Sequence, residues 1–103
     1  MLSPEQIQQY QRDGFLLLPG LVDSQTLTDL NQRFLDIVEG RQPAAGAMKI
    51  MQDVMVVKGA VQPQTPLHAV NKLFCLEDDE VLSTFACLPS VVDCVRSIIG
   101  DEI

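Results

Sequence analysis

The sequence predicts an α+β fold that is mostly helical, with about five helices and two short strands. Capping residues followed by proline or by acids mark several helix starts, and apolar residues then recur at helical spacing. Two short apolar runs that end at glycine or proline are typical of strands. With 103 residues, 47% of them hydrophobic and 20% charged, the chain has the size and composition of one small folded domain.

The first helix is predicted from Pro4 to about Asp13. Ser3 is its N-cap, and Pro4 occupies the first helical position, where a missing N–H has no cost. Gln6 lies three residues after the cap and completes a capping box. Gly14 is expected to end the helix in the left-handed conformation that glycine adopts without strain.

A strand is predicted at Phe15 to Leu18. These four apolar residues show no alternation and are too few for a helix, so the run is expected to be buried on both faces. Pro19-Gly20 ends it. A strand of this kind needs apolar cover on two sides, which raises the question of what supplies that cover.

The second helix has Asp23 or Ser24 as its cap and ends at Gly40. Its apolar residues recur at i, i+3, i+7, i+10 and i+11 and define one face: Leu27, Leu30, Phe34, Ile37 and Val38. This spacing predicts a helix that packs on one side only. A loop from Arg41 to Ala47, rich in proline, glycine and alanine, follows it.

A second strand is expected at Val54 to Val57, because this run is rich in β-branched residues and stops at Lys58-Gly59. Two strands make no independently stable sheet. Since both predicted strands have an apolar side chain at every position, they are expected to belong to a larger sheet than the chain contains.

Three further helices are predicted in the second half of the chain. Thr65-Pro66 starts the third, and the acidic run Glu77 to Glu80 starts the fourth, where the helix dipole favours negative charge. Pro89 opens the fifth and Gly100 ends it. The residues expected to face inward on these helices are Leu67, Val70, Phe74, Val81, Leu82, Phe85, Ala86, Val91, Val92, Val95, Ile98 and Ile99.

The charge balance excludes several classes of partner. The net charge of −7, from 14 acids and 7 bases, argues against binding of nucleic acid, which requires a concentrated positive surface. It also disfavours a basic helix on a membrane surface. The first residues lack the basic and apolar regions typical of a signal peptide, and the three cysteines, Cys75, Cys87 and Cys94, lack a CxxC spacing. Reduced, partly buried thiols in an intracellular protein are therefore expected.

The sequence contains no set of residues with the types and spacing of a known catalytic site. His68 is the single histidine, so these residues alone cannot form a two-histidine-one-carboxylate iron site or a three-histidine zinc site. We expect His68 on a helix surface and the cysteines in packing positions. The run Glu77 to Glu80 lacks the alternating ligands and central glycine of a calcium loop, so a solvated helix start is the better interpretation.

Lys72 is the charged residue of most interest, because it lies among apolar neighbours in Ala69 to Phe74. Two interpretations are open. The side chain either snorkels from a partly buried helix, or is held where it meets an anionic group.

Three stretches carry a family resemblance: LSPEQIQQYQRDGFLLLPGLV at the start, MKIMQDVMVVKG in the middle, and CLEDDEVLSTFACLPSVVDCVRSIIGDEI at the end. Their order and spacing resemble the N-terminal region of the phytanoyl-CoA dioxygenase family, and within it the hydroxylases, across nearly all 103 residues. The acidic start, leucine-proline break and terminal glycine of the last stretch make the resemblance more specific.

The resemblance implies an Fe(II)- and 2-oxoglutarate-dependent dioxygenase that hydroxylates a small molecule or an acyl-CoA. It implies a core built as a double-stranded β-helix, or jelly roll, with iron held by a His-x-Asp motif and a later histidine. An arginine further on anchors 2-oxoglutarate. None of these ligands is present in the sequence, so neither iron nor 2-oxoglutarate is expected to bind these residues alone. Lys72 is similar to the lysine that approaches 2-oxoglutarate in the family, and is the single candidate cofactor-binding residue.

Residues 1–103 are therefore expected to be a single N-terminal part of such a domain, truncated before the iron-binding barrel, with the barrel core absent. The expected compartment is the cytoplasm, or the peroxisome for a eukaryotic hydroxylase. The alternative is a non-catalytic helical interaction module, complete as it stands, that self-associates through exposed apolar surface. A small helical enzyme of unrelated chemistry is a third hypothesis.

Overall fold

Three helices form where the sequence predicts them. The computed structural model describes all of residues 1–103, in which α1 spans Pro4–Asp13, α2 spans Ser24–Val38 and α5 spans Pro89–Ile99. The predicted apolar face of α2 is confirmed in its second half, since Ile37 is buried and Phe34 is half-buried. Nearer the start of α2, Leu30 packs against the core cluster, whereas Leu27 is 52% exposed.

The local signals at the ends of α1 act as predicted. The hydroxyl of Ser3 accepts the N–H of Gln6 at 3.2 Å, and the side-chain oxygen of Gln6 accepts the N–H of Ser3 at 2.9 Å. These two bonds are the reciprocal capping box. Gly14 ends the helix at φ 78°, and its N–H donates to the carbonyl of Tyr10. Asp23 caps α2 by accepting the N–H of Thr26 at 2.9 Å.

The segment Phe15 to Leu18 is extended but is not a strand, so that prediction is wrong. No backbone hydrogen bond involves these four residues, because no strand lies beside them. Their side chains alternate: Phe15 and Leu17 are 65% and 78% exposed, while Leu16 and Leu18 are half-buried. The segment therefore has the shape of a strand with one covered face and no partner.

The strands lie elsewhere than predicted. Strand β1, Lys49–Gln52, pairs antiparallel with β2, Val70–Phe74, and the two form a two-stranded sheet. The run Val54–Val57, predicted as a strand, is the short helix α3. The carboxylate of Asp53 accepts the N–H of Met55 at 2.8 Å and caps this turn, which outweighs the strand propensity of valine.

The predicted third helix is also wrong. A single 3-10 turn, η1, covers Pro66–Ala69, and the chain then enters β2. The predicted inward-facing residues Val70 and Phe74 lie in this strand and not on a helix. Pairing with β1 satisfies the backbone of this segment, and a helical apolar stripe of three residues is too weak a signal to compete with it.

The predicted fourth helix begins later than the acidic run. A 3-10 turn, η2, covers Leu76–Asp78, and the helix α4 spans only Thr84–Cys87. Among the side chains expected to be buried there, Leu82 is buried, whereas Val81 and Phe85 are exposed. Asp79 accounts for the later start, because its carboxylate accepts the N–H groups of Val81 and Leu82 in the manner of a helix cap and so places helical backbone after Asp79.

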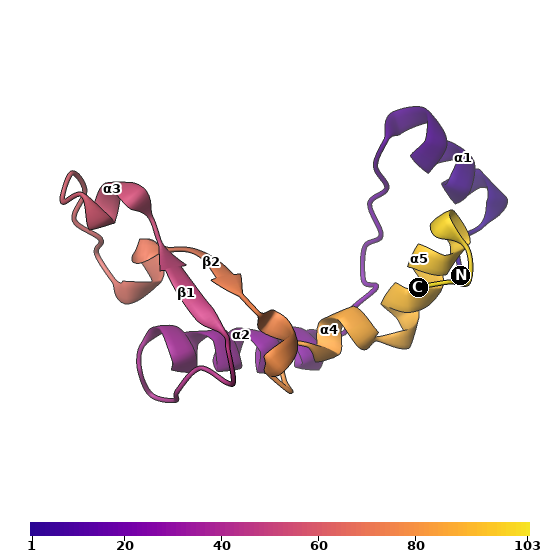
Figure 1. Ribbon diagram of the computed structural model, residues 1–103. Helices are drawn as coiled ribbons and strands as arrows, with labels where there is room; N and C mark the ends of the chain where they lie inside the picture. The colour runs from indigo at the N-terminus through magenta and orange to yellow at the C-terminus, as the bar shows by residue number, and fades with distance from the viewer.

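The core is small and the molecule is elongated. The sheet and α3 lie at one end and α1 and α5 at the other, with α2 and α4 between them (Figure 1). The radius of gyration is 17.1 Å, against about 13 Å for a compact chain of this length. Only 6 of the 103 residues are buried. The main cluster joins α2 to the sheet and comprises Ile37, Met48 and Leu82, with Leu30, Phe34, Ile50 and Leu73 around them.

Candidate functional site

Lys72 lies on the outer face of the β1–β2 sheet. It is exposed, takes part in no ion pair, and its Nζ atom lies 5.0 Å from the centre of the Phe74 ring. This distance is within the range of a cation–π contact. Because Lys72 is on a strand, the interpretation as a lysine snorkelling from a helix is wrong. The other interpretation, that Lys72 meets an anionic group, remains a prediction.

The remaining candidate groups do not gather around Lys72. His68 is exposed in η1, as expected for a surface histidine. The three cysteines are free, but Cys75 and Cys87 are exposed and only Cys94 is partly buried, so the expectation of packed thiols holds for one of three. No three histidine, cysteine or acidic side chains lie where they could hold a metal ion.

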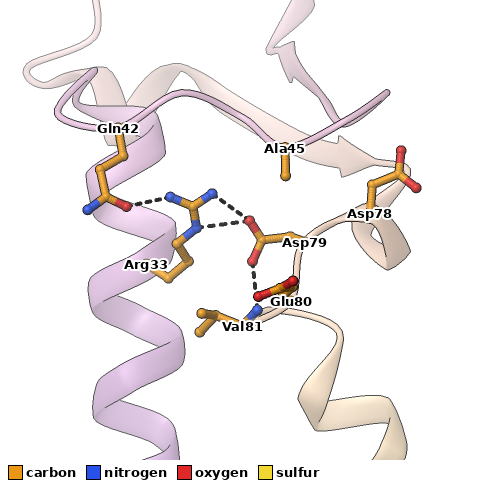
Figure 2. Close-up of a pocket in the computed structure, with 7 residues that line it drawn as sticks. All are labelled: Arg33, Gln42, Ala45, Asp78, Asp79, Glu80 and Val81. Carbon is orange, nitrogen blue, oxygen red and sulfur yellow. Dashed lines mark hydrogen bonds and ion pairs between the residues drawn. The ribbon is translucent and has the colours of Figure 1, made fainter.

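An ion pair that the sequence analysis does not predict joins Arg33 of α2 to Asp79 (Figure 2). Arg33 donates from Nε to Oδ2 of Asp79 at 2.8 Å, and its Nη2 lies 2.7 Å from the same oxygen. The other carboxylate oxygen accepts the N–H groups of Val81 and Leu82 at 3.0 and 2.9 Å. Asp79 is only 1% exposed, so the expectation of a solvated acidic run is wrong at this position.

The surroundings of Asp79 keep its carboxyl group ionised. Burial on its own raises the pKa of Asp79, but the hydrogen bonds from Arg33 and from the backbone of Leu82 outweigh burial. The pKa of this carboxyl therefore lies below its ordinary value. A sequence signal for this pair exists: Arg33 lies three residues after Leu30 and four before Ile37, on the apolar side of α2.

A pocket of about 350 Å³ lies beside this ion pair and is lined by Arg33, Gln42, Ala45, Asp78, Asp79, Glu80 and Val81. Its one cation is Arg33, and each of the three guanidinium nitrogens already donates to a protein acceptor. Besides Asp79, the guanidinium of Arg33 binds the side chain of Gln42 at 2.6 Å and the carbonyl of Pro43 at 3.2 Å. Three of the lining residues are acidic. The pocket therefore lies at a structural contact between α2, the loop after it and the segment from Asp78 to Val81, and it suits no anionic ligand.

Two apolar hollows lie at the other end of the molecule. One, of about 230 Å³, is lined mainly by apolar residues of α1, α5 and the segment between α1 and α2. The other, of about 470 Å³, is lined mainly by apolar residues of α4 and α5 together with Ile103. Each has few polar side chains in its lining: Tyr10 in the first and Arg96 in the second. None of the helices is long and apolar enough to cross a membrane.

Comparison with known proteins gives three informative relatives. A probable phytanoyl-CoA dioxygenase of Caenorhabditis elegans is 34% identical over 101 residues, which are 98% of this chain and 32% of that protein. The proteins named peroxisomal phytanoyl-CoA dioxygenase from Bos taurus and Rattus norvegicus are 27% and 28% identical over 103 residues, 100% of this chain and 30% of each. The chain thus spans about a third of the length of these relatives. No protein-family model and no solved structure matches it.

Proposed function

The chain is a homologue of the phytanoyl-CoA dioxygenases over almost its whole length, and we propose that it is the N-terminal segment of an Fe(II)- and 2-oxoglutarate-dependent dioxygenase. The observation that carries this proposal is the 34% identity with the nematode relative across 98% of the chain. The names of the relatives support a dioxygenase function, and an acyl-CoA is the substrate class that they suggest. The mammalian names favour the peroxisome over the cytoplasm.

The distribution of apolar side chains supports the proposal that these residues form part of a larger domain. Phe15 and Leu17 stand on the open side of an extended segment whose backbone has no partner. Exposed backbone groups of this kind pair readily with the edge of a sheet. In the proposed enzyme, a jelly-roll barrel outside residues 1–103 covers this segment and completes the sheet that it implies.

The two cofactors fit these residues differently. Iron does not fit, because one exposed histidine and scattered carboxylates supply no ligand set. A carboxylate of 2-oxoglutarate fits Lys72, whose ammonium group is free of any ion pair and accessible on the sheet face. When bound, 2-oxoglutarate supplies the electrons for oxygen activation in this class of enzyme. The contribution of the chain is to attract and orient one end of that anion.

The first experiment is to sequence the coding DNA beyond the codon for Ile103. An open frame that reaches a His-x-Asp motif, a later histidine and an arginine supports the proposal. The encoded enzyme should then convert 2-oxoglutarate to succinate when phytanoyl-CoA is supplied. A stop codon directly after Ile103 would contradict it and leave these residues without a catalytic function of their own.

The exposed apolar surface also supports a second candidate, a non-catalytic interaction module that self-associates. Large apolar side chains are exposed on both ends of the molecule, among them Phe15, Val57 and Ile99. Sedimentation of the 103-residue chain at rising concentration distinguishes the two candidates. A concentration-dependent dimer favours the module, and a monomer that binds no hydrophobic dye argues against it.

A further inference from the structure

Two lysines share the outer face of the β1–β2 sheet. In the register of the strands, Lys49 is opposite Phe74 and Met51 is opposite Lys72. Residues directly opposite one another in an antiparallel pair point to the same side of the sheet. The buried side is occupied by Ile50 and Leu73, which pack against the main core cluster. The two lysines are therefore diagonal neighbours on the exposed side, about 7–8 Å apart by the usual geometry of such pairs.

These two lysines form no ion pair, although acids outnumber bases in the protein. Each arginine forms an ion pair with a nearby acid, in the pairs Arg12–Asp13, Arg33–Asp79, Arg41–Asp36 and Arg96–Asp93. None of the ion pairs in the structure involves a lysine. Two of the three lysines of the chain, Lys49 and Lys72, lie on this one face. Their positive charge is therefore not neutralised by a partner and remains free to attract an anion.

Apolar groups complete the same face. Phe74 and Met51 are 43% and 44% exposed and occupy the positions between the two lysines. The Phe74 ring also holds the Lys72 ammonium group above it, at 5.0 Å from the ring centre, which restricts its rotamers. The face thus presents two cations alternating with an aromatic ring and a thioether.

We propose that Lys49 and Lys72 together form one binding site for an oxyanion that is attached to an apolar chain. The proposal rests on the proposed function through Lys72 and adds Lys49 as a second binding residue. Two ammonium groups match a ligand with at least two negative charges, while Phe74 and Met51 contact its methylene groups. Both a dicarboxylate such as 2-oxoglutarate and the phosphate groups of an acyl-CoA have this chemistry.

The test is a titration of the isotope-labelled 103-residue chain, followed by backbone amide shifts in NMR spectra at constant ionic strength. Two probes are used in separate arms, 2-oxoglutarate and coenzyme A, into the millimolar range, because two exposed ammonium groups bind weakly. The family resemblance alone implies no 2-oxoglutarate binding to these residues, whereas a two-lysine site requires weak, millimolar binding, so we expect one of the probes to shift the amides of β1 and β2 together. The probe that does so identifies the source of the oxyanion.

Three variants make the test specific: Lys49→Gln, Lys72→Gln and the control Lys58→Gln. Lys58 is also exposed and unpaired, but it lies at the end of α3 and off the sheet face. Removal of Lys49 or Lys72 should weaken binding roughly two- to fivefold, as for other exposed charge pairs. The Lys58 variant should bind as the parent does, and Lys49→Arg should restore most of the affinity lost in Lys49→Gln.

Each other outcome overturns the two-lysine site. Equal weakening in all three variants would mean a response to overall charge. Weakening in Lys72→Gln alone would remove Lys49 from the site and leave the proposed function intact. No shift with either probe would overturn the site, whereas the proposed function would still be decided by the coding sequence beyond Ile103. Dispersed amide spectra of every variant check that loss of binding is not loss of folding.

Discussion

Arg33 and Asp79, which are 46 positions apart in the sequence, form the main polar link between α2 and the second half of the chain. The Asp79 carboxylate is 1% exposed, and the Arg33 side chain is 16% exposed. Because both charges are shielded from water, removal of either one leaves the other without a partner. Removal of either residue should therefore cost a similar amount of stability.

Replacement of Asp79 by alanine should lower the free energy of unfolding by about 3 kcal/mol, since Arg33 and two backbone N–H groups lose their acceptor. Urea unfolding followed by circular dichroism measures the change. The control is Glu80→Ala at the next, exposed position, where a change within about 0.5 kcal/mol is expected. Equal effects of the two substitutions would show that the ion pair contributes nothing specific.

The same carboxyl group makes stability depend on pH in a defined direction. The pKa of Asp79 is lower in the folded chain than its ordinary value, so below about pH 5 the unfolded state binds more protons than the folded state. Its stabilising contribution is complete above the unfolded pKa of about 3.9 and is lost as pH falls through the folded pKa. The urea midpoint should therefore fall on acidification.

The matched variant for this pH dependence is Asp79→Asn, which cannot titrate at this position. Its urea midpoint should fall less steeply with acid than that of the parent chain. Other carboxyl groups with lowered pKa values, including those of Asp23 and Asp36, remain in both proteins and cancel in the comparison. Parallel pH profiles of the two proteins would assign the acid sensitivity to these other groups.

Local signals predict much of this fold, and the pairing of distant segments accounts for some of the errors. The capping box at Ser3 and the proline at position 89 fix α1 and α5, because the groups that decide each helix start are neighbours in sequence. Val70–Phe74 is a strand and not the predicted helix because it pairs with β1, whereas Val54–Val57 is helical because Asp53 caps it. No pattern within either run specifies that β2 pairs with Lys49–Gln52.

The candidate sites also divide into features that the sequence predicts and features that depend on contacts between distant segments. Lys72 was identified through a family resemblance, and the structure adds that it stands on an open sheet face beside Phe74. The Arg33–Asp79 pair was missed, because four consecutive acids look alike in sequence and only long-range packing selects one of them for burial. Arg33 within the apolar stripe of α2 was the sequence feature that pointed to a buried partner.

Phe34 anchors α2 to the core cluster, and Phe34→Ala should destabilise the chain by about 2 kcal/mol. This is less than the 3–5 kcal/mol typical of a fully buried phenylalanine, since Phe34 is only half-buried. The control is Leu27→Ala on the same helix, because Leu27 is 52% exposed and should cost no more than about 0.5 kcal/mol. Thermal unfolding of both variants gives the comparison, and equal losses would remove Phe34 from the core.

In a full-length enzyme that carries this segment, Lys72→Ala should raise the KM for 2-oxoglutarate without lowering the melting temperature. In the proposed role the ammonium group attracts one end of the anion, and its exposure on β2 means that it supports no buried structure. Steady-state succinate formation at varied 2-oxoglutarate measures this effect. Lys58→Ala is the charge-matched control, and an unchanged KM in the Lys72 variant would exclude it from cofactor binding.

Gly46 lies where the loop after α2 meets Asp78, and two separate constraints act on it. Its φ is +52°, and a Cβ atom there would lie 2.5 Å from Oδ2 of Asp78. That same oxygen accepts the N–H of Ala47 at 2.6 Å, so it cannot move away without loss of the hydrogen bond. Gly46→Ala should therefore destabilise the chain by about 2 kcal/mol or more.

Gly40 provides the control that separates the two constraints. It has a φ of +74°, but a Cβ atom there would meet nothing within 4 Å. Gly40→Ala should carry only the backbone cost of about 1 kcal/mol, so the difference between the two variants measures the collision with Asp78. Addition of Asp78→Ala to Gly46→Ala should recover only part of that difference, because the Cβ atom of residue 78 would still lie 2.9 Å from the new Cβ and the hydrogen bond to Ala47 is lost. A double variant that is no more stable than Gly46→Ala alone would show that the collision with the Asp78 oxygen does not cause the extra loss of stability.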